Sequence, residues 1–261
     1  MPFETSNGLR WFEFENLRHS SLTQAIFTRV GGESPRPWAS LNFGRTVGDD
    51  DAQVERNQTR GLEALGRRSD SAFLVWQVHS SDYLRADRPS TSERPKADIV
   101  LTANPAVTLV MRFADCLPIF LYDPRQRAVA LVHAGWQGTV RRAAEVAVQA
   151  LTKEFGSRPQ DLQAGIGPSI GPDHYPVGED VVTQMERAFG SRAEQYLQRH
   201  NGEMRLDLWS ANAELLKQAG VPSVEVSGIC TVCHLEDWFS HRGEHGRTGR
   251  FGAILALGAA S

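Results

Sequence analysis

The sequence has few cysteines, no long hydrophobic run and little excess charge. Its 261 residues include three cysteines, an odd number that makes a poor disulfide framework. No apolar stretch approaches the roughly 20 residues that span a bilayer, and residues 1–7 lack the basic region and apolar core of a signal peptide. The formal charge of −3 indicates no broad nucleic-acid or membrane surface. We therefore expect a cytoplasmic protein with a small-molecule partner, and the composition leaves the oligomeric state open.

Short apolar runs, several of them separated by helical patterns, make up most of the chain. The runs are rich in β-branched and aromatic residues and end at turn residues, which is typical of buried strands. They cover residues 24–28, 72–78, 107–113, 128–132, 162–166, 223–229 and 251–257. Helices are predicted over 52–65 with Asp51 as N-cap, from Thr139 to about Gly156, over 179–189 and over 208–219. Strands and helices without strict alternation favour an α/β fold with a mixed sheet, of α+β character, in a single domain covering residues 1–261.

Three soft metal ligands share one placement relative to these runs. His79, Cys116 and His133 each lie just past the end of an apolar run. Because strand ends at one edge of a sheet can bring distant side chains together, these three residues are predicted to meet. Two imidazoles and one thiolate suit zinc, and three protein ligands leave a fourth position open, as in catalytic sites. Each histidine alone is more simply a buried or turn histidine, so the repeated placement carries the prediction.

The cysteine of this set lies in the segment Asp115-Cys116-Leu117-Pro118. A free cysteine is often only a small buried hydrophobe. However, a charge such as Asp115 between two apolar strands is costly unless it is paired or functional. Pro118 has no N–H to donate, so we expect the strand to be interrupted there. Zinc would hold Cys116 as a thiolate, and without metal Cys116 and His133 can form a nucleophile–base pair.

Arginines and tryptophans supply the candidate substrate contacts. The segment 240–250 collects three arginines among glycines, and a guanidinium suits phosphate or carboxylate, although a solvated charged loop is the simpler explanation. Trp136 is a candidate for stacking on a ring substrate, whereas Trp76 is predicted to belong to the core.

A short motif near the C-terminus invites a different interpretation. Residues 230–234 read Cys-Thr-Val-Cys-His, the attachment pattern of c-type haem. That chemistry belongs to exported proteins, and the segment is predicted to continue a strand toward Ser240, which leaves little room for haem. We therefore attribute the match to chance. The spacing does not decide whether His174 approaches the predicted metal site.

Several segments together resemble one known family, the YfiH-like or laccase-domain family. They are residues 28–32, 40–44, 77–79, 114–118, 132–138, 167–171 and 239–242, in the family's order and over nearly the whole chain. The resemblance implies a single α/β domain related in fold to the cysteine-hydrolase domain of cytotoxic necrotising factor. It also implies zinc bound by the residues matching His79, Cys116 and His133. The chain departs from the pattern at Gln137, where arginine is common, and at Thr46, where histidine is frequent.

Members of this family have been described as polyphenol oxidases, as purine nucleoside phosphorylases with adenosine deaminase activity, and as editing enzymes of peptidoglycan precursors. A multicopper oxidase needs about ten histidines, many in H-x-H pairs. This chain has 8 histidines and no H-x-H pair, so copper is less expected than zinc, although a single copper could give weak oxidation.

The resemblance and the ligand set together predict a zinc-dependent purine nucleoside phosphorylase, with adenosine deamination as a second activity. Adenosine or inosine and phosphate would give the base and ribose 1-phosphate. The residues expected to take part are Cys116, His133 and Asp115 in catalysis, the last as proton shuttle, and Arg242, Arg250, Asn42 and Trp136 in binding nucleoside or phosphate. One alternative is an amide hydrolase acting on cell-wall precursors with Cys116 as nucleophile. Another is a non-catalytic zinc-stabilised binding protein, which the open coordination position disfavours.

Overall fold

The computed structural model of the chain describes residues 2–90 and 94–258, and its strands form two large sheets and one small one. The first sheet has the order β1 (Phe3–Ser6), β2 (Leu9–Phe12), β3 (Leu22–Phe27), β15 (Phe251–Leu257), β7 (Thr108–Phe113), β4 (Ala72–Leu74). The second has the order β14 (Ser223–Val226), β10 (Gln163–Ile166), β8 (Leu117–Asp123), β9 (Ala128–Ala134), β6 (Ile99–Thr102), β5 (Tyr83–Arg85). The third is β11 (Pro176–Val177), β13 (Glu203–Leu206), β12 (Leu197–His200). Both large sheets mix parallel and antiparallel pairs, which confirms the predicted mixed α/β class.

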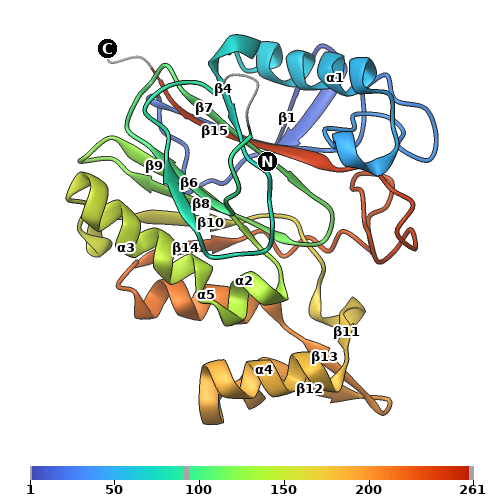
Figure 1. The fold of residues 1–261 in the computed structure, drawn as a ribbon, viewed down its shortest axis with the longest axis vertical. Coiled ribbons are helices and arrows are strands. Elements are labelled where there is room, and N and C mark those ends of the chain that lie inside the picture. Colours follow the sequence, from blue (N-terminus) through green and yellow to red (C-terminus); the bar gives the residue numbers. More distant parts are fainter. Residues whose placement is uncertain (1, 91–93, 259–261) are drawn as a thin grey trace.

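Most of the helices cover the outer faces of the two large sheets (Figure 1). They are α1 (Asp51–Ala64), α2 (Trp136–Val140), α3 (Ala143–Phe155), α4 (Glu179–Phe189) and α5 (Leu208–Gln218), with short 3-10 turns at 45–47, 69–71, 159–161, 172–174 and 190–195. In Figure 1, α1 lies over the first sheet, and α2, α3 and α5 lie against the second. Helix α4 and the small sheet form the lower end of the molecule.

Alternation along the central strands explains this layering. Ile119 and Leu121 of β8 pack with the residues of α3 and α5, whereas Phe120 and Tyr122 pack with residues of the first sheet. In β9 the helix-facing positions are mostly alanines, which let α3 come close. Because both faces of these strands are buried, each strand reads as a continuous apolar run. The main core therefore lies between the two sheets, with further cores under α1 and under α3 and α5.

Most predicted elements are present, and several boundaries are corrected. Strand β15 and helix α4 have the predicted bounds. Helix α1 is capped by Asp50, not Asp51, because the Asp50 side chain accepts from the N–H of Gln53. The helix predicted from Thr139 is two helices, because Arg142 adopts a left-handed conformation with φ of 58° between α2 and α3. Pro118 is the second residue of β8, so the chain turns before that strand rather than breaking within it.

The segment after β14 also differs from its prediction. Strand β14 ends at Val226, Cys230 forms an isolated bridge with Ser169, and residues 231–237 form turns rather than a strand leading to Ser240. Within the described ranges, no helix is both long and apolar enough to cross a membrane.

Candidate functional site

The three predicted metal ligands lie together. One nitrogen of His79, one nitrogen of His133 and the sulfur of Cys116 are all within 4.8 Å of one another. His79 follows β4, Cys116 lies in the turn between β7 and β8, and His133 is in β9. The ligands thus come from both large sheets, which corrects the expectation that they would share one edge of a single sheet.

Strand pairing and alternation place His133. It lies opposite Pro118 in the β8–β9 register, which brings it close to the turn that carries Cys116. Val129 and Leu131 of the same strand face the first sheet, so the period of two turns His133 toward that sheet as well. Its ring lies 5.4 Å from the ring of Phe113, the last residue of β7. The imidazole therefore sits at the end of the core between the two sheets.

Asp98, which was not among the predicted site residues, fixes the position of both histidines. Its fully buried carboxylate is 2.8 Å from Nδ1 of His133, which leaves Nε2 free to act as a ligand. The same carboxylate accepts hydrogen bonds from the backbone N–H groups of Val78, His79 and Ser80. Burial works to raise the pKa of Asp98, but hydrogen bonding and the charge of His133 outweigh it and lower the pKa to about 2. A charged residue directly before the apolar strand 99–102 was the available signal.

The ligand set fits zinc on the evidence of this geometry. A carboxylate–histidine pair is the usual support of a zinc-binding imidazole. Gly135 leaves room for the sulfur, because a Cβ at this position would lie 2.8 Å from Sγ of Cys116. Burial works to raise the pKa of Cys116, but the charge of His133 and hydrogen bonding to it lower the pKa to about 6. Conversely, burial works to lower the pKa of His133, but the thiolate and Asp98 raise it to about 9.

Asp115, the residue before Cys116, holds neighbouring turns in place through its carboxylate. It has a φ of 82°, a conformation that side chains with a Cβ rarely adopt. Its carboxylate accepts hydrogen bonds from the hydroxyls of Thr231 and Ser240, each at 2.7 Å, and from the backbone N–H of Arg242 at 2.6 Å. These three bonds hold the turns at 231 and 240–242 against the ligand turn, and they offset the cost of the unusual backbone conformation.

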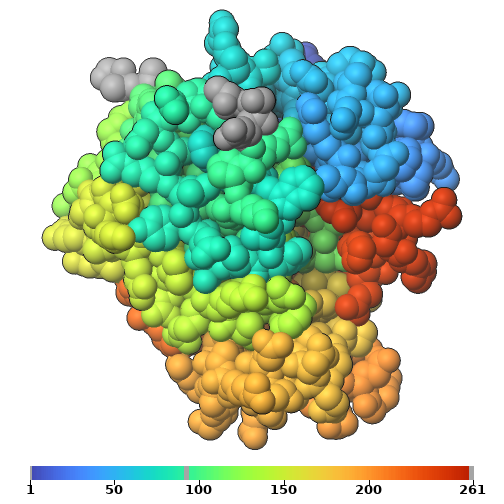
Figure 2. All heavy atoms as spheres, in the orientation of Figure 1, coloured from blue at the N-terminus to red at the C-terminus, as the bar shows by residue number. Residues whose placement is uncertain are grey.

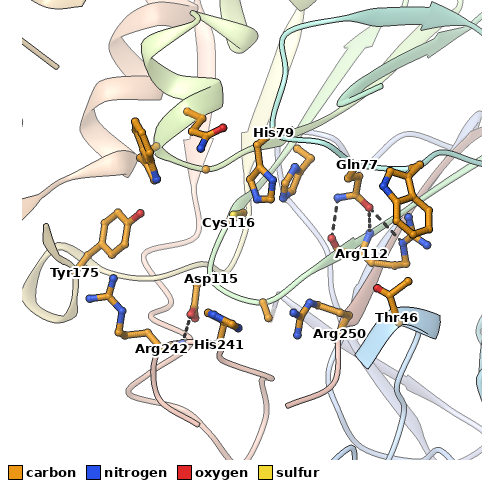
Figure 3. A pocket seen from close by; sticks show the side chains of 17 residues that line it. Thr46, Gln77, His79, Arg112, Asp115, Cys116, Tyr175, His241, Arg242 and Arg250 are labelled. Carbon is orange, nitrogen blue, oxygen red and sulfur yellow. Dashed lines mark hydrogen bonds between the residues drawn. The ribbon is translucent and has the colours of Figure 1, made fainter. Parts of the chain in front are cut away.

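The ligand cluster opens into a cavity of about 450 Å³, within the size range of small-molecule sites. In the space-filling view the recess lies where the blue, teal, red and gold segments meet (Figure 2). Figure 3 shows Arg112 and Arg250 on one side of His79 and Cys116, and Tyr175 and Arg242 on the other.

Three arginines line this cavity without a carboxylate partner. Within residues 2–90 and 94–258, neither Arg112, Arg242 nor Arg250 forms an ion pair with Asp or Glu. Burial lowers the pKa of Arg112 to about 10, with repulsion from other arginines adding to the effect, and burial also lowers the pKa of Arg250. Arg112 is held by the backbone oxygen of Val75 and by the amide of Gln77. Positive charge is thus concentrated beside the metal ligands.

The remaining predicted contacts are divided between the cavity and its support. Trp136 lines the cavity, as do Thr46 and Gln137, the two positions that depart from the family pattern. Asn42 is fully buried, and its side chain bonds Gly44, Asp49 and the N–H of Arg250, so it supports the cavity wall instead of facing the cavity.

Trp76 was predicted to belong to the core, and this prediction is wrong. It is 46% exposed and lines the cavity, because Val75 takes the inward position at the end of β4 and the next side chain points out. His174 does not line the cavity and lies beside Cys230 and Cys233 instead.

Comparison with known proteins identifies the family of the chain. A family model described as "multi-copper polyphenol oxidoreductase laccase" matches residues 23–258. A protein of Deinococcus radiodurans named purine nucleoside phosphorylase is 37% identical over 253 residues, covering 97% of this chain and 95% of that protein. The purine nucleoside phosphorylase YlmD of Geobacillus stearothermophilus is 36% identical over 241 residues, covering 88% of each. The crystal structure of the hypothetical protein YfiH of Bacillus licheniformis matches with a TM-score of 0.90 at 33% identity, covering 98% of this chain and 99% of that one. The chain belongs to the laccase-like family that includes YfiH and YlmD.

Proposed function

We propose that this protein is a zinc-dependent purine nucleoside phosphorylase that converts adenosine or inosine and phosphate into the free base and ribose 1-phosphate. The observation that carries the proposal is the meeting of two features in one cavity. The soft ligands His79, Cys116 and His133 line it together with three arginines that form no ion pair within the described residues. The names of the relatives support the same reaction class.

The arginines are suited to hold phosphate. A guanidinium binds phosphate through paired N–H donors, and such charge-assisted bonds are among the strongest in proteins. Arg250 and Arg112 lie on the same side of the cavity (Figure 3). An anion bound between them would relieve the repulsion that lowers the pKa of Arg112. A bound phosphate would supply the negative charge that balances these two arginines.

Aromatic side chains are suited to hold the nucleoside base. Trp76, Trp136 and Tyr175 all line the cavity, and flat rings favour offset stacking with a purine. The guanidinium of Arg242 lies 5.2 Å from the centre of the Tyr175 ring, which fixes that ring from one side. The base and the phosphate would therefore be held by different sets of side chains around the same ligand cluster.

His79, Cys116 and His133 would hold the zinc ion, and the ion would act as a Lewis acid toward an oxygen at its open coordination position. Asp98 keeps Nε2 of His133 available and fixes the backbone at His79. Asp115 is our candidate proton shuttle in the cavity wall. Its three hydrogen bonds support, in addition, a role in holding Arg242 at the cavity.

The histidine distribution favours one metal ion over several coppers at this site. Only three histidines line the described cavity, His79, His133 and His241, whereas a multicopper centre needs about ten. We therefore propose zinc as the metal, with adenosine deamination as a reaction to be tested at the same site.

One observation favours a second candidate function, amide hydrolysis by Cys116. Without metal, the lowered pKa of Cys116 and the raised pKa of His133 give a thiolate beside an imidazolium, which is the state of a cysteine nucleophile. The two functions differ in their response to chelation. A zinc phosphorylase loses activity when the metal is removed, whereas a cysteine hydrolase keeps it and forms an acyl-enzyme at Cys116.

The test is to incubate zinc-loaded protein with adenosine, with and without phosphate, and to separate the products. We expect adenine and ribose 1-phosphate only when phosphate is present, no turnover by Cys116→Ala, and loss of turnover on chelation. Inosine in either condition would add deamination. Phosphorolysis that persists without all three ligands would contradict the proposal, and turnover of a peptide amide that resists chelation would support the hydrolase instead.

A further inference from the structure

We propose a second metal site of the zinc class at His174, Cys230 and Cys233, outside the cavity. Their ligand atoms all lie within 4.8 Å of one another, although His174 is 56 residues before Cys230 in the sequence. The site combines the C-x-x-C pair of the haem-like motif with a histidine from a different turn. His234, the histidine of that motif, is 3.3 Å from Glu236 and is not part of the cluster.

The distances within the cluster match those between zinc ligands. Nδ1 of His174 is 3.8 Å from Sγ of Cys230 and 3.6 Å from Sγ of Cys233. Zinc–sulfur bonds of about 2.3 Å and zinc–nitrogen bonds of about 2.0 Å at tetrahedral angles place sulfur and nitrogen about 3.6 Å apart. One nitrogen is thus placed at ligand-to-ligand distance from both thiols. A histidine that only hydrogen bonds a thiol needs to approach one of them.

The backbone around Cys230 is built to support a thiolate. The N–H of Gly171 donates to Sγ of Cys230 at 3.2 Å, a bond that stabilises a charged sulfur. A Cβ on Gly171 would lie 3.1 Å from Cβ and 3.3 Å from Sγ of Cys230, so only glycine lets the two turns come so close. The Ser169–Cys230 bridge, with the N–H of Thr231 donating to Ser169, fixes this contact.

The charge near this cluster favours a cation. Asp173, the residue before His174, lies close enough to Cys233 for its negative charge to act on the thiol. A divalent cation between the sulfurs would be attracted by Asp173 and would hold both sulfurs as thiolates. Cys233 and His174 are exposed, so an ion can enter from solvent and water can fill the fourth position.

The proposed ion would join the turn that leads to the cavity wall at Tyr175 to the turn that supports Asp115. His174 directly precedes Tyr175, which lines the cavity, and Cys230 directly precedes Thr231, which bonds Asp115. Binding at this site would fix the position of the Tyr175 wall relative to Asp115. The inference is independent of the reaction proposed for the cavity, because metal content and stability report it without any substrate.

The experiment measures bound zinc per chain by native mass spectrometry and elemental analysis after reduced protein is loaded with zinc and desalted. The two exposed ligands are replaced separately, as Cys233→Ser and His174→Ala, because neither substitution disturbs the core. His234→Ala, in the residue next to Cys233, is the matched control. Cys116→Ala removes the cavity ion and isolates the second site.

We expect two zinc ions in the wild type and in His234→Ala, and one in Cys233→Ser, His174→Ala or Cys116→Ala. In the Cys116→Ala background, chelation should lower the melting temperature, and cobalt in place of zinc should show thiolate-to-metal charge-transfer absorption that Cys233→Ser weakens. A Cys116→Ala protein that binds no zinc would overturn the proposal, as would zinc content unaffected by Cys233→Ser and His174→Ala. Recovery of the unreduced protein as a form lighter by two hydrogen atoms, with no zinc uptake after reduction, would assign the pair to a disulfide instead.

Discussion

Two clusters in this molecule are built from cysteine and histidine side chains, and they differ in the charged groups and the cavity around them. In the cavity, Cys116 lies between His79 and His133, and in the other cluster His174 lies between Cys230 and Cys233. The cavity cluster is backed by the buried carboxylate of Asp98 and shares the cavity with arginines that form no ion pair in residues 2–90 and 94–258. In the described part of the chain, no carboxylate is hydrogen bonded to the ring of His174, and that cluster joins two turns beside the cavity.

If the cavity cluster is the reaction centre, as proposed, then the ligand set alone does not define such a centre. Neighbouring groups lower the pKa of Cys116 to about 6 and raise that of Cys233 above its ordinary value. A carboxylate that fixes one histidine, a cavity for substrate and positive charge for an anion are found only around the first cluster of the two. The following predictions test this contrast, from the largest expected effect to the smallest.

Replacing Asp98 with alanine should have the largest effect, because it removes the support that only the cavity cluster has. The change leaves His133 and three backbone N–H groups without their buried acceptor. We expect zinc affinity at the cavity to fall by about 10–100-fold and the free energy of unfolding of metal-free protein to fall by about 3–5 kcal/mol. Competition with a chromophoric chelator and urea denaturation measure the two quantities.

The matched control is Asp87→Ala, which breaks an exposed ion pair with Arg85 and should leave the unfolding free energy nearly unchanged. If Asp98→Ala bound zinc at the cavity as tightly as the wild type does, the carboxylate would not distinguish the cavity cluster from the second cluster.

Arg250→Ala should weaken phosphate binding without changing nucleoside binding. Charged hydrogen bonds contribute about 1.5–3 kcal/mol, so the KM for phosphate should rise about 10–100-fold. Initial rates at varied phosphate and saturating adenosine measure the effect. Arg158→Ala, which breaks an ion pair with Asp161 away from the cavity, should leave both KM values unchanged. An equal rise in both KM values for Arg250→Ala would place the phosphate elsewhere.

Alkylation of metal-free protein should separate the two clusters by pH. Thiolates exist above the pKa, so Cys116 should gain reactivity toward iodoacetamide as the pH rises through about 6, whereas Cys233 should need alkaline solution. At pH 7 we expect Cys116 to react at least about fivefold faster, although Cys233 is the more exposed thiol. Peptide mass spectrometry after timed quenching gives both rates. Faster reaction of Cys233 at pH 7 would contradict the assigned charges.

Trp76→Ala should have the smallest effect, because the ring lies at the exposed edge of the cavity. Loss of one stacking contact costs about 0.5–1.5 kcal/mol, which predicts a rise in the nucleoside KM of about two- to twelvefold with kcat and the phosphate KM unchanged. Val30→Ala, also an exposed apolar residue but outside the cavity, should change none of these constants. An unchanged nucleoside KM in Trp76→Ala would place the base away from this edge.

The spacing of apolar and turn residues along the sequence predicted the elements whose bounds depend only on neighbouring residues. Strand β15 and helix α4 have the predicted bounds because their turn residues and apolar spacing lie next to each other in sequence. The break at Arg142 was missed because the apolar spacing continues through it while the backbone does not. Trp76 was assigned to the core because its run is apolar, but pairing of β4 with β7 ends at Leu74.

The three residues of the proposed metal site were predicted together because each follows an apolar run in the sequence, whereas the contacts that support them depend on pairing between distant segments. Asp98 bonds His133 from 35 residues away. The second cluster was dismissed for the same reason. The motif at 230–234 suggested His234 as the histidine, and the folded chain supplies His174 instead. A sequence without related sequences beside it gives no sign of such a partner.

The most direct test of the central claim compares phosphorolysis of adenosine by zinc-loaded Cys116→Ala and Cys233→Ala. Loss of a metal ligand at the reaction centre removes several kcal/mol of transition-state stabilisation, so Cys116→Ala should lose at least about a thousandfold in kcat/KM. Cys233→Ala, which affects only the wall beside Tyr175, should lose less than about tenfold. Equal losses in the two variants, or a Cys116→Ala protein as active as the wild type, would contradict the assignment of the cavity cluster as the reaction centre.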